Sequence, residues 1–483
     1  SELREAVLEL PAAAGSLPLP QNCSRSAPSS PQKMLLPALA LSSAFLAPHA
    51  ASRALSTSKV AMNGGKGFGG GEATRDPAPT VIDPNDPKGK QQAIHKAESF
   101  AEYLAKRSAG GGAAPAGGSA GAYPSLPPSV KPGVLTGQAV VDLLEDAKRR
   151  GYAIPAVNCV TSSSVNACLE AAAAAKAPVM IQFSSGGAQF YAGKGLDNTD
   201  FDAAVAGAVS GAHHVRTLAA KYGVPVILHT DHCAKKLLPW VDGMLAESEA
   251  HYAAHGEPLF SSHMLDLSEE PLEENIAICV EYMQRMAKLD MLLEMELGIT
   301  GGEEDGVDNE NANPEDLYTK PEEVWMVQEA LQAVPNAKFT IAAAFGNVHG
   351  VYAPGNVKLD PKILRNSQEY ISQQLGLGAG AKPCSFVFHG GSGSDINDIK
   401  EAISYGVIKM NIDTDTQWAY WDGIRSYSEE NRAYLQSQIG NPEGPDKPNK
   451  KFYDPRMPVR SAEETTVARL GQCFSDLNCV DVF

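Results

Sequence analysis

The sequence predicts an α/β protein, a closed (β/α)₈ TIM barrel, preceded by a long amino-terminal region that we expect to be disordered. Two observations predict the barrel. Eight short β-rich runs alternate with stretches of helical pattern, and nearly every run ends at a residue that can do chemistry. Alternating strands and helices favour a parallel sheet covered by helices. Polar side chains at the strand ends are typical of barrels, whose active sites form at the carboxyl ends of the strands.

The expected strands follow one another from residue 152 onward. They are Tyr152–Val157, Pro178–Phe183, Pro225–His229, Phe260–Leu265, Met291–Leu297, Lys338–Phe345, Cys384–Phe388 and Val407–Ile412. Helical patterns lie between many of them, including Gly137–Arg150, Val165–Ala175, Glu270–Leu289 and Pro321–Val334. Periodicity alone does not decide whether the sheet closes, but eight alternating units fit a closed barrel better than an open sheet.

Composition excludes several classes of protein. Of the 483 residues, 43% are hydrophobic, which is enough for a large core and excludes wholesale disorder. The net charge of −17 argues against a nucleic-acid partner, because such a protein would show a basic face. No apolar run reaches the roughly 18 residues that a membrane-spanning helix needs. We therefore expect neither a nucleic acid nor a membrane among the partners.

The first 129 residues differ from the rest in charge and composition. Residues 1–130 hold 12 Lys and Arg against 9 Asp and Glu, whereas the remaining 353 residues hold 28 against 48. Residues 1–33 are an upstream segment of uncertain status. Residues 34–71 contain no acid and combine an apolar run after Met34 with Phe45 and a Ser- and Ala-rich stretch. This pattern is typical of a signal peptide followed by a transit peptide, and it predicts import into the plastid of a complex alga. A mitochondrial presequence, an untranslated stretch read in frame and a cytoplasmic location are the alternatives.

Residues 72–129 have the composition of a linker, with a glycine- and alanine-rich run at 108–122. One helix is possible at residues 90–107, with Ile94, Ala97, Phe100 and Leu104 along one side. A marginal helix in a tail is the simpler interpretation, and a docking element is the alternative. The folded domain is expected over residues 130–483.

Three histidines follow three different strands and predict a metal site. His232, His349 and His389 would converge at the mouth of the barrel, and three imidazoles with an open fourth position are the ligands of a catalytic Zn²⁺. A single histidine is more often an ordinary half-buried residue, but three at strand ends favour the ligand interpretation. Glu296 and Asp266 offer nearby oxygen atoms that could bind the metal or orient its ligands.

Acids and glycine-rich loops accompany the histidines. Asp231 adjoins His232 and could exchange a proton with a reacting oxygen. The loop at 301–306 combines glycines with paired carboxylates, which elsewhere would be an exposed acidic turn. The segments at 389–394 and 411–414 follow the last two strands, where barrels commonly bind phosphate through backbone N–H groups.

Five segments together resemble the class II fructose-bisphosphate aldolases of the bacterial type. They are residues 229–236, 296–306, 345–350, 389–394 and 411–416, and the similarity extends from about Val130 to Phe483. The resemblance implies a zinc-dependent, reversible cleavage of fructose 1,6-bisphosphate to dihydroxyacetone phosphate and glyceraldehyde 3-phosphate. Zn²⁺ would take the role of the electrophile that a lysine supplies in Schiff-base aldolases.

The resemblance also implies the role of each residue. His232, His349 and His389 would hold Zn²⁺, with Glu296 and Asp266 close by. Asp231 would move the proton at the aldehyde or C4 oxygen, Glu304 would act on the triose carbon with Glu303 as the competing candidate, and Asn411 would hold the enediolate. The residues implied in substrate binding are Asn158, Ser184, Gly350, Gly390, Gly391, Ser392, Asp413, Thr414 and Arg456.

Further implications concern partners. Arg456 would reach a phosphate across the interface of a homodimer, although a surface salt bridge is the plain alternative. A monovalent cation, K⁺ or Na⁺, would bind backbone oxygens near Val348 and Gly390. A tagatose-bisphosphate aldolase is the closest alternative enzyme, and a binding or scaffold role of the amino-terminal tail is an alternative of another class.

Overall fold

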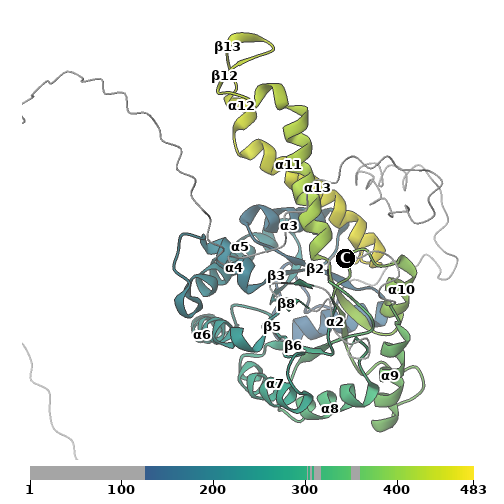
Figure 1. The fold of residues 1–483 in the computed structure, drawn as a ribbon. Helices are drawn as coiled ribbons and strands as arrows, with labels where there is room; N and C mark the ends of the chain where they lie inside the picture. The colour runs from purple at the N-terminus through teal and green to yellow at the C-terminus, as the bar shows by residue number, and fades with distance from the viewer. Residues whose placement is uncertain (1–125, 302, 305–306, 309–316, 350–358) are drawn as a thin grey trace, which may run out of the picture. The chain divides into compact units, whose positions relative to one another are not determined.

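The computed structural model describes residues 126–301, 303–304, 307–308, 317–349 and 359–483 (Figure 1). Segments 1–33 and 34–71 and the possible helix at 90–107 lie outside these residues, as does most of the expected linker. Within the described residues no helix is both long and apolar enough to cross a membrane.

All eight predicted strands are present and run parallel. They are β2 Ile154–Asn158, β3 Val179–Phe183, β4 Pro225–Thr230, β5 Ser262–Leu265, β6 Leu292–Leu297, β9 Phe339–Ala343, β10 Phe386–Phe388 and β11 Val407–Asn411. Hydrogen-bonded neighbours follow the order β4-β3-β2-β11-β10-β9-β6-β5, and the two-residue β1 (Gly133–Val134) adds to β4. Most of these strands are continuous buried runs, as expected where both faces of a parallel sheet are covered.

Contacts between β4 and β5 complete the circle. The amide of Ser261 donates to the carbonyl of Leu228 at 2.9 Å, and the amide of Asp266 donates to the carbonyl of Cys233 at the same distance. Between these two bonds, Thr230 Oγ1 lies 2.7 Å from His263 Nδ1. The first strand of the series is thereby joined to the last, and the prediction of a TIM barrel is confirmed.

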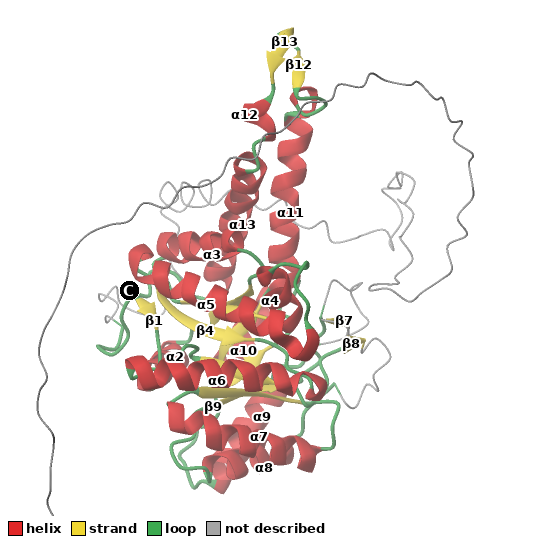
Figure 2. Cartoon of the chain, turned by 90° about the vertical axis from the view of Figure 1, so that its left-hand side faces the viewer, coloured by secondary structure: helices red, strands yellow, loops and turns green. Residues whose placement is uncertain are grey.

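Helices surround the barrel (Figure 2). They are α2 Gln138–Arg150, α3 Ser162–Ala175, α4 Ser185–Ala192, α5 Asp202–Tyr222, α6 Leu238–His255, α7 Leu272–Met286, α8 Pro321–Gln332, α9 Lys362–Gln374 and α10 Ile396–Ser404, with short 3₁₀ turns η1 Thr199–Phe201, η2 Lys235–Leu237 and η3 Ala287–Leu289. Local signals fix several ends. Thr161 and Ser164 form a capping box at the start of α3, and α2 ends at Gly151 in the left-handed conformation.

A helical arm follows the last barrel strand. It comprises α11 Asp413–Glu430, η4 Arg432–Tyr434, the hairpin β12 Ile439–Asn441 and β13 Gly444–Pro448, α12 Lys450–Tyr453 and α13 Arg456–Asp476. Helices α11 and α13 pack side by side and project from the barrel, with the hairpin at the far end (Figures 1 and 2). The other short strands, β7 Glu303–Glu304 and β8 Val307–Asp308, form an antiparallel pair in the loop after β6.

Candidate active site

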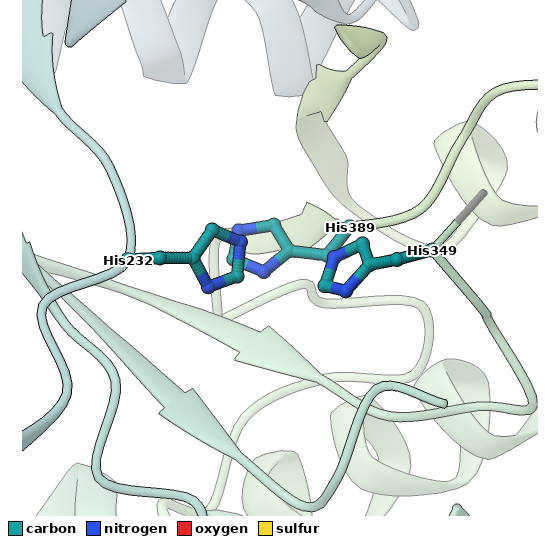
Figure 3. Close-up of side chains that lie close together, drawn as sticks. All are labelled: His232, His349 and His389. Atoms are coloured by element: carbon teal, nitrogen blue, oxygen red, sulfur yellow. The ribbon is translucent and has the colours of Figure 1, made fainter. Parts of the chain in front are cut away.

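Three histidines meet at the carboxyl ends of the barrel strands (Figure 3). His232 follows β4, His349 follows β9 and His389 follows β10, and one ligand nitrogen from each lies within 4.8 Å of the others. The ring of His232 lies 5.1 Å from that of His349 and 4.7 Å from that of His389. His232 takes a φ of 41°, a conformation that non-glycine residues seldom adopt. The predicted convergence of the three rings is confirmed.

Two carboxylates approach the same rings. Asp266 Oδ2 lies 3.1 Å from His232 Nδ1, and Glu296 Oε2 lies 3.1 Å from His389 Nδ1 and 3.5 Å from His232 Nδ1. Thr300 donates to the other oxygen of Glu296 at 2.7 Å and so fixes its orientation. Burial raises the pKa of Asp266, but its hydrogen bonds with His232 and Ser268 outweigh burial and leave that pKa below its usual range. The group of His232, Asp266 and Glu296 is a second set of ligand atoms that could hold a cation, beside the set of three histidines.

Asp231 lies fully buried beside this cluster and receives three amide groups. The Nδ2 atoms of Asn158 and Asn411 donate to its carboxylate at 2.9 and 3.1 Å, and Gln182 Nε2 donates at 2.8 Å. Among the described residues, the amide oxygens of these three side chains accept no hydrogen bond. The predicted Asn158, Asp231 and Asn411 are therefore brought together, and Gln182 is a member that the sequence analysis missed.

A second layer of charge lies below, inside the barrel. Glu294 accepts hydrogen bonds from Lys409 Nζ at 2.7 and 2.9 Å and from His389 Nε2 at 3.0 Å, and His229 Nε2 lies 3.6 Å away. All four residues are buried. Glu294 and Lys409 were not predicted to belong to the site. A signal existed, because Glu294, Lys409 and His229 each precede a predicted site residue by two positions and a strand has a period of two.

This layer changes the protonation of the histidines. Burial lowers the pKa of His389, but Glu296 and Glu294 outweigh burial and raise that pKa to about 9. Burial and the ammonium of Lys409 instead hold the pKa of His229 well below its usual value. Metal-free His389 is therefore an imidazolium that donates to both carboxylates, whereas His229 is neutral.

The loops after β9 and β10 and the first turn of α11 lie beside the histidine cluster. A Cβ on Gly390 would lie 2.2 Å from the carbonyl oxygen of Val348, so only glycine fits between the loops after β9 and β10. The amide of Gly391 donates to the carbonyl of Asn411 at 3.1 Å. Ser392 Oγ accepts from the amide of Asp415 in the first turn of α11, where backbone N–H groups can receive an anion. These two hydrogen bonds hold the loop that contains Ser392 against the end of β11 and the start of α11. Asn411 ends β11, and Asp413 and Thr414 begin α11.

The remaining predicted residues are placed less closely or lie outside the description. Ser184 caps α4 by accepting from the amide of Gly187 at 3.2 Å, directly after β3. Only the backbone of Glu304 is described, and Gly350 lies outside the described residues. Arg456 begins α13 in the arm, where its side chain is 88% exposed and is paired with Asp454. Within one chain, Arg456 is not brought to the histidine cluster.

Comparisons with known proteins agree with this geometry. The family described as fructose-bisphosphate aldolase class-II matches residues 138–482. The chain is 63% identical to a fructose-bisphosphate aldolase of Haemophilus influenzae over 355 residues, which cover 73% of this chain and 98% of the relative. It is 58% identical over 354 residues to a fructose-bisphosphate aldolase class 2 of Escherichia coli K12, with the same coverage. The crystal structure of the Campylobacter jejuni fructose-bisphosphate aldolase superposes with a TM-score of 0.67 at 57% identity, covering 74% of this chain and 98% of that one.

Proposed function

The chain belongs to the class II fructose-bisphosphate aldolases, and from this premise we propose how its residues divide the work of the reaction. The activity is the cleavage of fructose 1,6-bisphosphate to two triose phosphates and the reverse condensation. Class II aldolases use Zn²⁺, and we assign it to His232, His349 and His389, with Glu296 and Asp266 as neighbouring oxygen donors. The convergence of these three imidazoles is the observation that carries the assignment.

The donor set fits this metal. Neutral imidazole nitrogens and carboxylate oxygens are ordinary Zn²⁺ ligands, and the second-layer acids can orient the rings. When bound, Zn²⁺ supplies Lewis acidity that stabilises negative charge developing on a substrate oxygen.

Asp231 is the residue that we propose to exchange a proton with the C4 hydroxyl or the aldehyde oxygen. Its carboxylate is held in one position by Asn158, Gln182 and Asn411, so little reorganisation is needed during proton transfer. The amide oxygens of Asn158 and Asn411 accept no hydrogen bond among the described residues and are suited to receive substrate hydroxyl groups. Asn411 in addition would hold the developing charge of the triose.

Glu304 is proposed as the base at the triose carbon, with Glu303 as the alternative. The two residues form β7, which pairs with β8 in the loop after β6. Gly301 lies beside His349 through the bond from the His349 amide to the Gly301 carbonyl at 2.7 Å, so this loop begins at the metal cluster. Exchange of Glu303 and Glu304 for Gln, one at a time, separates the two candidates: the base is the one whose loss abolishes proton exchange at the triose carbon.

The triose phosphate is proposed to bind beside α11. Ser392, Asp413 and Thr414 would receive it together with the backbone of Gly350, Gly390 and Gly391, and Ser184 would lie near the rest of the substrate. The first turn of α11 and the glycine-rich loop supply N–H groups for an anion in an otherwise acidic protein. A K⁺ or Na⁺ ion is proposed to bind backbone oxygens near Val348 and Gly390.

A homodimer would bring Arg456 to the second phosphate. The arm exposes large apolar side chains, which are Trp418, Trp421, Ile439, Tyr453 and Met457. Grouped exposed apolar residues are typical of interaction surfaces, and Arg456 lies among them. We expect Trp421→Glu to produce monomers in analytical ultracentrifugation and to raise the KM for fructose 1,6-bisphosphate, whereas Leu377→Glu, at an exposed site outside the arm, should leave the dimer intact.

The amino-terminal region is proposed to direct the protein to a plastid. The family match begins at residue 138, and residues 34–71 have the composition of a targeting sequence. A fluorescent protein fused after residue 129 should accumulate in plastids of an alga with complex plastids. Accumulation in mitochondria or in the cytosol would contradict this proposal without affecting the catalytic one.

Metal removal tests the catalytic assignment. The full chain should cleave fructose 1,6-bisphosphate, lose this activity in EDTA and regain it when Zn²⁺ is restored. Activity that persists when the metal content has been shown to be zero would contradict the metal assignment.

A further inference from the structure

Lys409 is a lysine that the barrel interior surrounds completely. Its exposure is 0%, and its ammonium contacts Glu294 at 2.7 and 2.9 Å and Asp231 Oδ1 at 3.9 Å. A lysine is almost never fully buried unless it is paired, since desolvating the charge is costly. The ammonium therefore has a structural partner below the site, in Glu294, and lies within ion-pair distance of the proposed proton carrier.

Glu294 connects this ammonium to the metal cluster. Its Oε1 lies 3.0 Å from His389 Nε2, while His389 Nδ1 lies 3.1 Å from Glu296. A carboxylate at Nε2 holds the proton on that nitrogen and presents Nδ1 to the cluster. Carboxylate partners of metal-binding histidines commonly fix both the tautomer and the ring orientation.

We propose that Lys409 and Glu294 are positioning residues that align the metal ligand His389 and the proton carrier Asp231 through one buried ion pair. The proposal rests on the assigned zinc site and adds two residues to it. Glu294 sets which nitrogen of His389 faces the metal. Lys409 keeps Glu294 in place and offers Asp231 a fixed positive charge, so the two halves of the site share one support.

The proposal also gives Lys409 a role other than that of a nucleophile. An amine that attacks a ketone must be neutral and must reach the substrate. The Lys409 amine is held in two hydrogen bonds to a carboxylate, below Asp231 and away from solvent. Borohydride in the presence of substrate should therefore not trap a covalent adduct on Lys409.

Two variants test the support. Glu294→Gln keeps the size of the side chain but removes its charge, and Lys409→Met keeps the length of the stem. We expect Glu294→Gln to weaken zinc binding 10- to 100-fold in chelator competition, and to change the visible absorption spectrum of the cobalt(II)-substituted protein. We expect Lys409→Met to lower kcat at least tenfold, with the KM for fructose 1,6-bisphosphate changed less than threefold.

Lys148→Met is the matched control. Lys148 has a largely buried side chain and pairs with Glu145 at 2.7 Å, but it donates to Ser385, which precedes β10, whereas His389 follows that strand. This variant should keep the wild-type zinc affinity, cobalt spectrum and kcat. If Glu294→Gln and Lys409→Met, like the control, changed only the temperature of thermal unfolding and left zinc affinity, cobalt spectrum and kcat unchanged, the two residues would be merely structural. That outcome would overturn the proposal.

A variant that fails to fold is replaced by Glu294→Asp, which keeps the ion pair but shortens its reach to His389. The proposal expects an altered cobalt spectrum there too, and an unchanged spectrum would overturn it. If the wild-type enzyme instead kept its activity after a chelator had removed its metal, the zinc assignment itself would be contradicted. Failures of the two proposals are therefore distinguishable.

Discussion

At the scale of single residues, protons and a metal ion compete for the ring nitrogen atoms of the site histidines. His389 lies between Glu294 and Glu296, and these carboxylates stabilise its positive charge more than burial opposes it. The same carboxylates would orient the neutral ring toward a metal. In the metal-free chain, a proton on His389 would therefore compete with a metal ion for this ring.

Zinc affinity should consequently depend on pH. With a pKa of about 9 in the metal-free chain, His389 is protonated at neutral pH and must lose a proton when Zn²⁺ binds. From this residue alone, we expect the affinity to rise about tenfold per pH unit up to about pH 9 and to level off above it. Chelator competition at pH 6 to 10 measures the slope. An affinity that is constant between pH 7 and 9 would contradict this account.

Asp231 should matter for chemistry more than for metal binding. In Asp231→Asn an NH₂ group would face three amide donors, and at least one buried donor would lose its acceptor. We expect the free energy of unfolding to fall by about 1–3 kcal/mol and kcat to fall about 10²- to 10⁴-fold. Urea unfolding and steady-state kinetics measure the two effects.

The variant Glu247→Gln, at an exposed position on α6, is the control for Asp231→Asn and should change neither quantity. Zinc affinity of Asp231→Asn should stay within a few-fold of wild type, because the carboxylate is not among the three assigned histidine ligands. A loss of metal binding as large as the loss of kcat would assign Asp231 to the metal instead.

At the scale of helices and strands, the sequence predicted the site residues that end the strands. It did not predict the site residues within the strands, whose side chains lie inside the barrel. All eight strands were placed within about two residues of their observed ends, and Asp231, Glu296 and Asn411 were recognised there. Glu294 and Lys409 were missed. Their pairing joins strands 115 positions apart in sequence, and only the closed barrel brings those strands face to face.

The arm was beyond the reach of the same reasoning. Its helices α11 and α13 pack on each other, α13 also packs on α3, and α11 leaves two tryptophans exposed. No barrel periodicity describes such a pair. The resemblance to a family supplied a role for Arg456, but nothing in the residues around it predicted that it would begin a helix far along the arm.

Packing between α4 and α5 gives a prediction at this scale. A Cβ on Gly207 of α5 would lie 1.8 Å from the carbonyl oxygen of Ala188 in α4, so the two helices must separate in Gly207→Ala. We expect a loss of about 1–3 kcal/mol in the free energy of unfolding. Because Ser184 caps α4, the KM for fructose 1,6-bisphosphate should rise as well.

Gly195→Ala is the control for this substitution. Gly195 has open space around its Cβ position, and its free energy of unfolding should change by no more than about 0.5 kcal/mol. Denaturant titration compares the two variants. Equal stability of Gly207→Ala and wild type would contradict the close contact between α4 and α5.

At the scale of the whole molecule, the barrel concentrates ionisable groups in a core that must stay folded around them. The chain carries a net charge of −17, and several of its acids are buried at one end of the barrel beside histidines. Each buried histidine that is kept neutral makes folding sensitive to acid, because the unfolded chain can accept a proton that the folded chain cannot. The dependence of the free energy of unfolding on pH therefore reports the protonation of the histidines inside the barrel.

His263 in β5 provides the clearest case. Burial, together with the nearby His229 and Arg285, lowers its pKa to about 3, whereas an unfolded histidine titrates near 6.5. Between these values the unfolded state binds more protons, so stability falls as pH falls, by about 1.4 kcal/mol per pH unit for His263. The lowered pKa of His229 acts in the same direction. The raised pKa of His389 has the opposite sign: its contribution in the metal-free chain is complete below pH 6.5 and is lost as pH rises toward 9.

Urea unfolding of the EDTA-treated chain at pH 5, 6 and 7 should therefore show stability decreasing toward pH 5. In His263→Gln this slope should become shallower by about one proton's worth, roughly 1.4 kcal/mol per pH unit. The variant His213→Gln, at an exposed position on α5, is the control and should keep the wild-type slope. A slope in His263→Gln equal to that of wild type would show that His263 accepts its proton without unfolding, and that the contact between β4 and β5 opens to admit it.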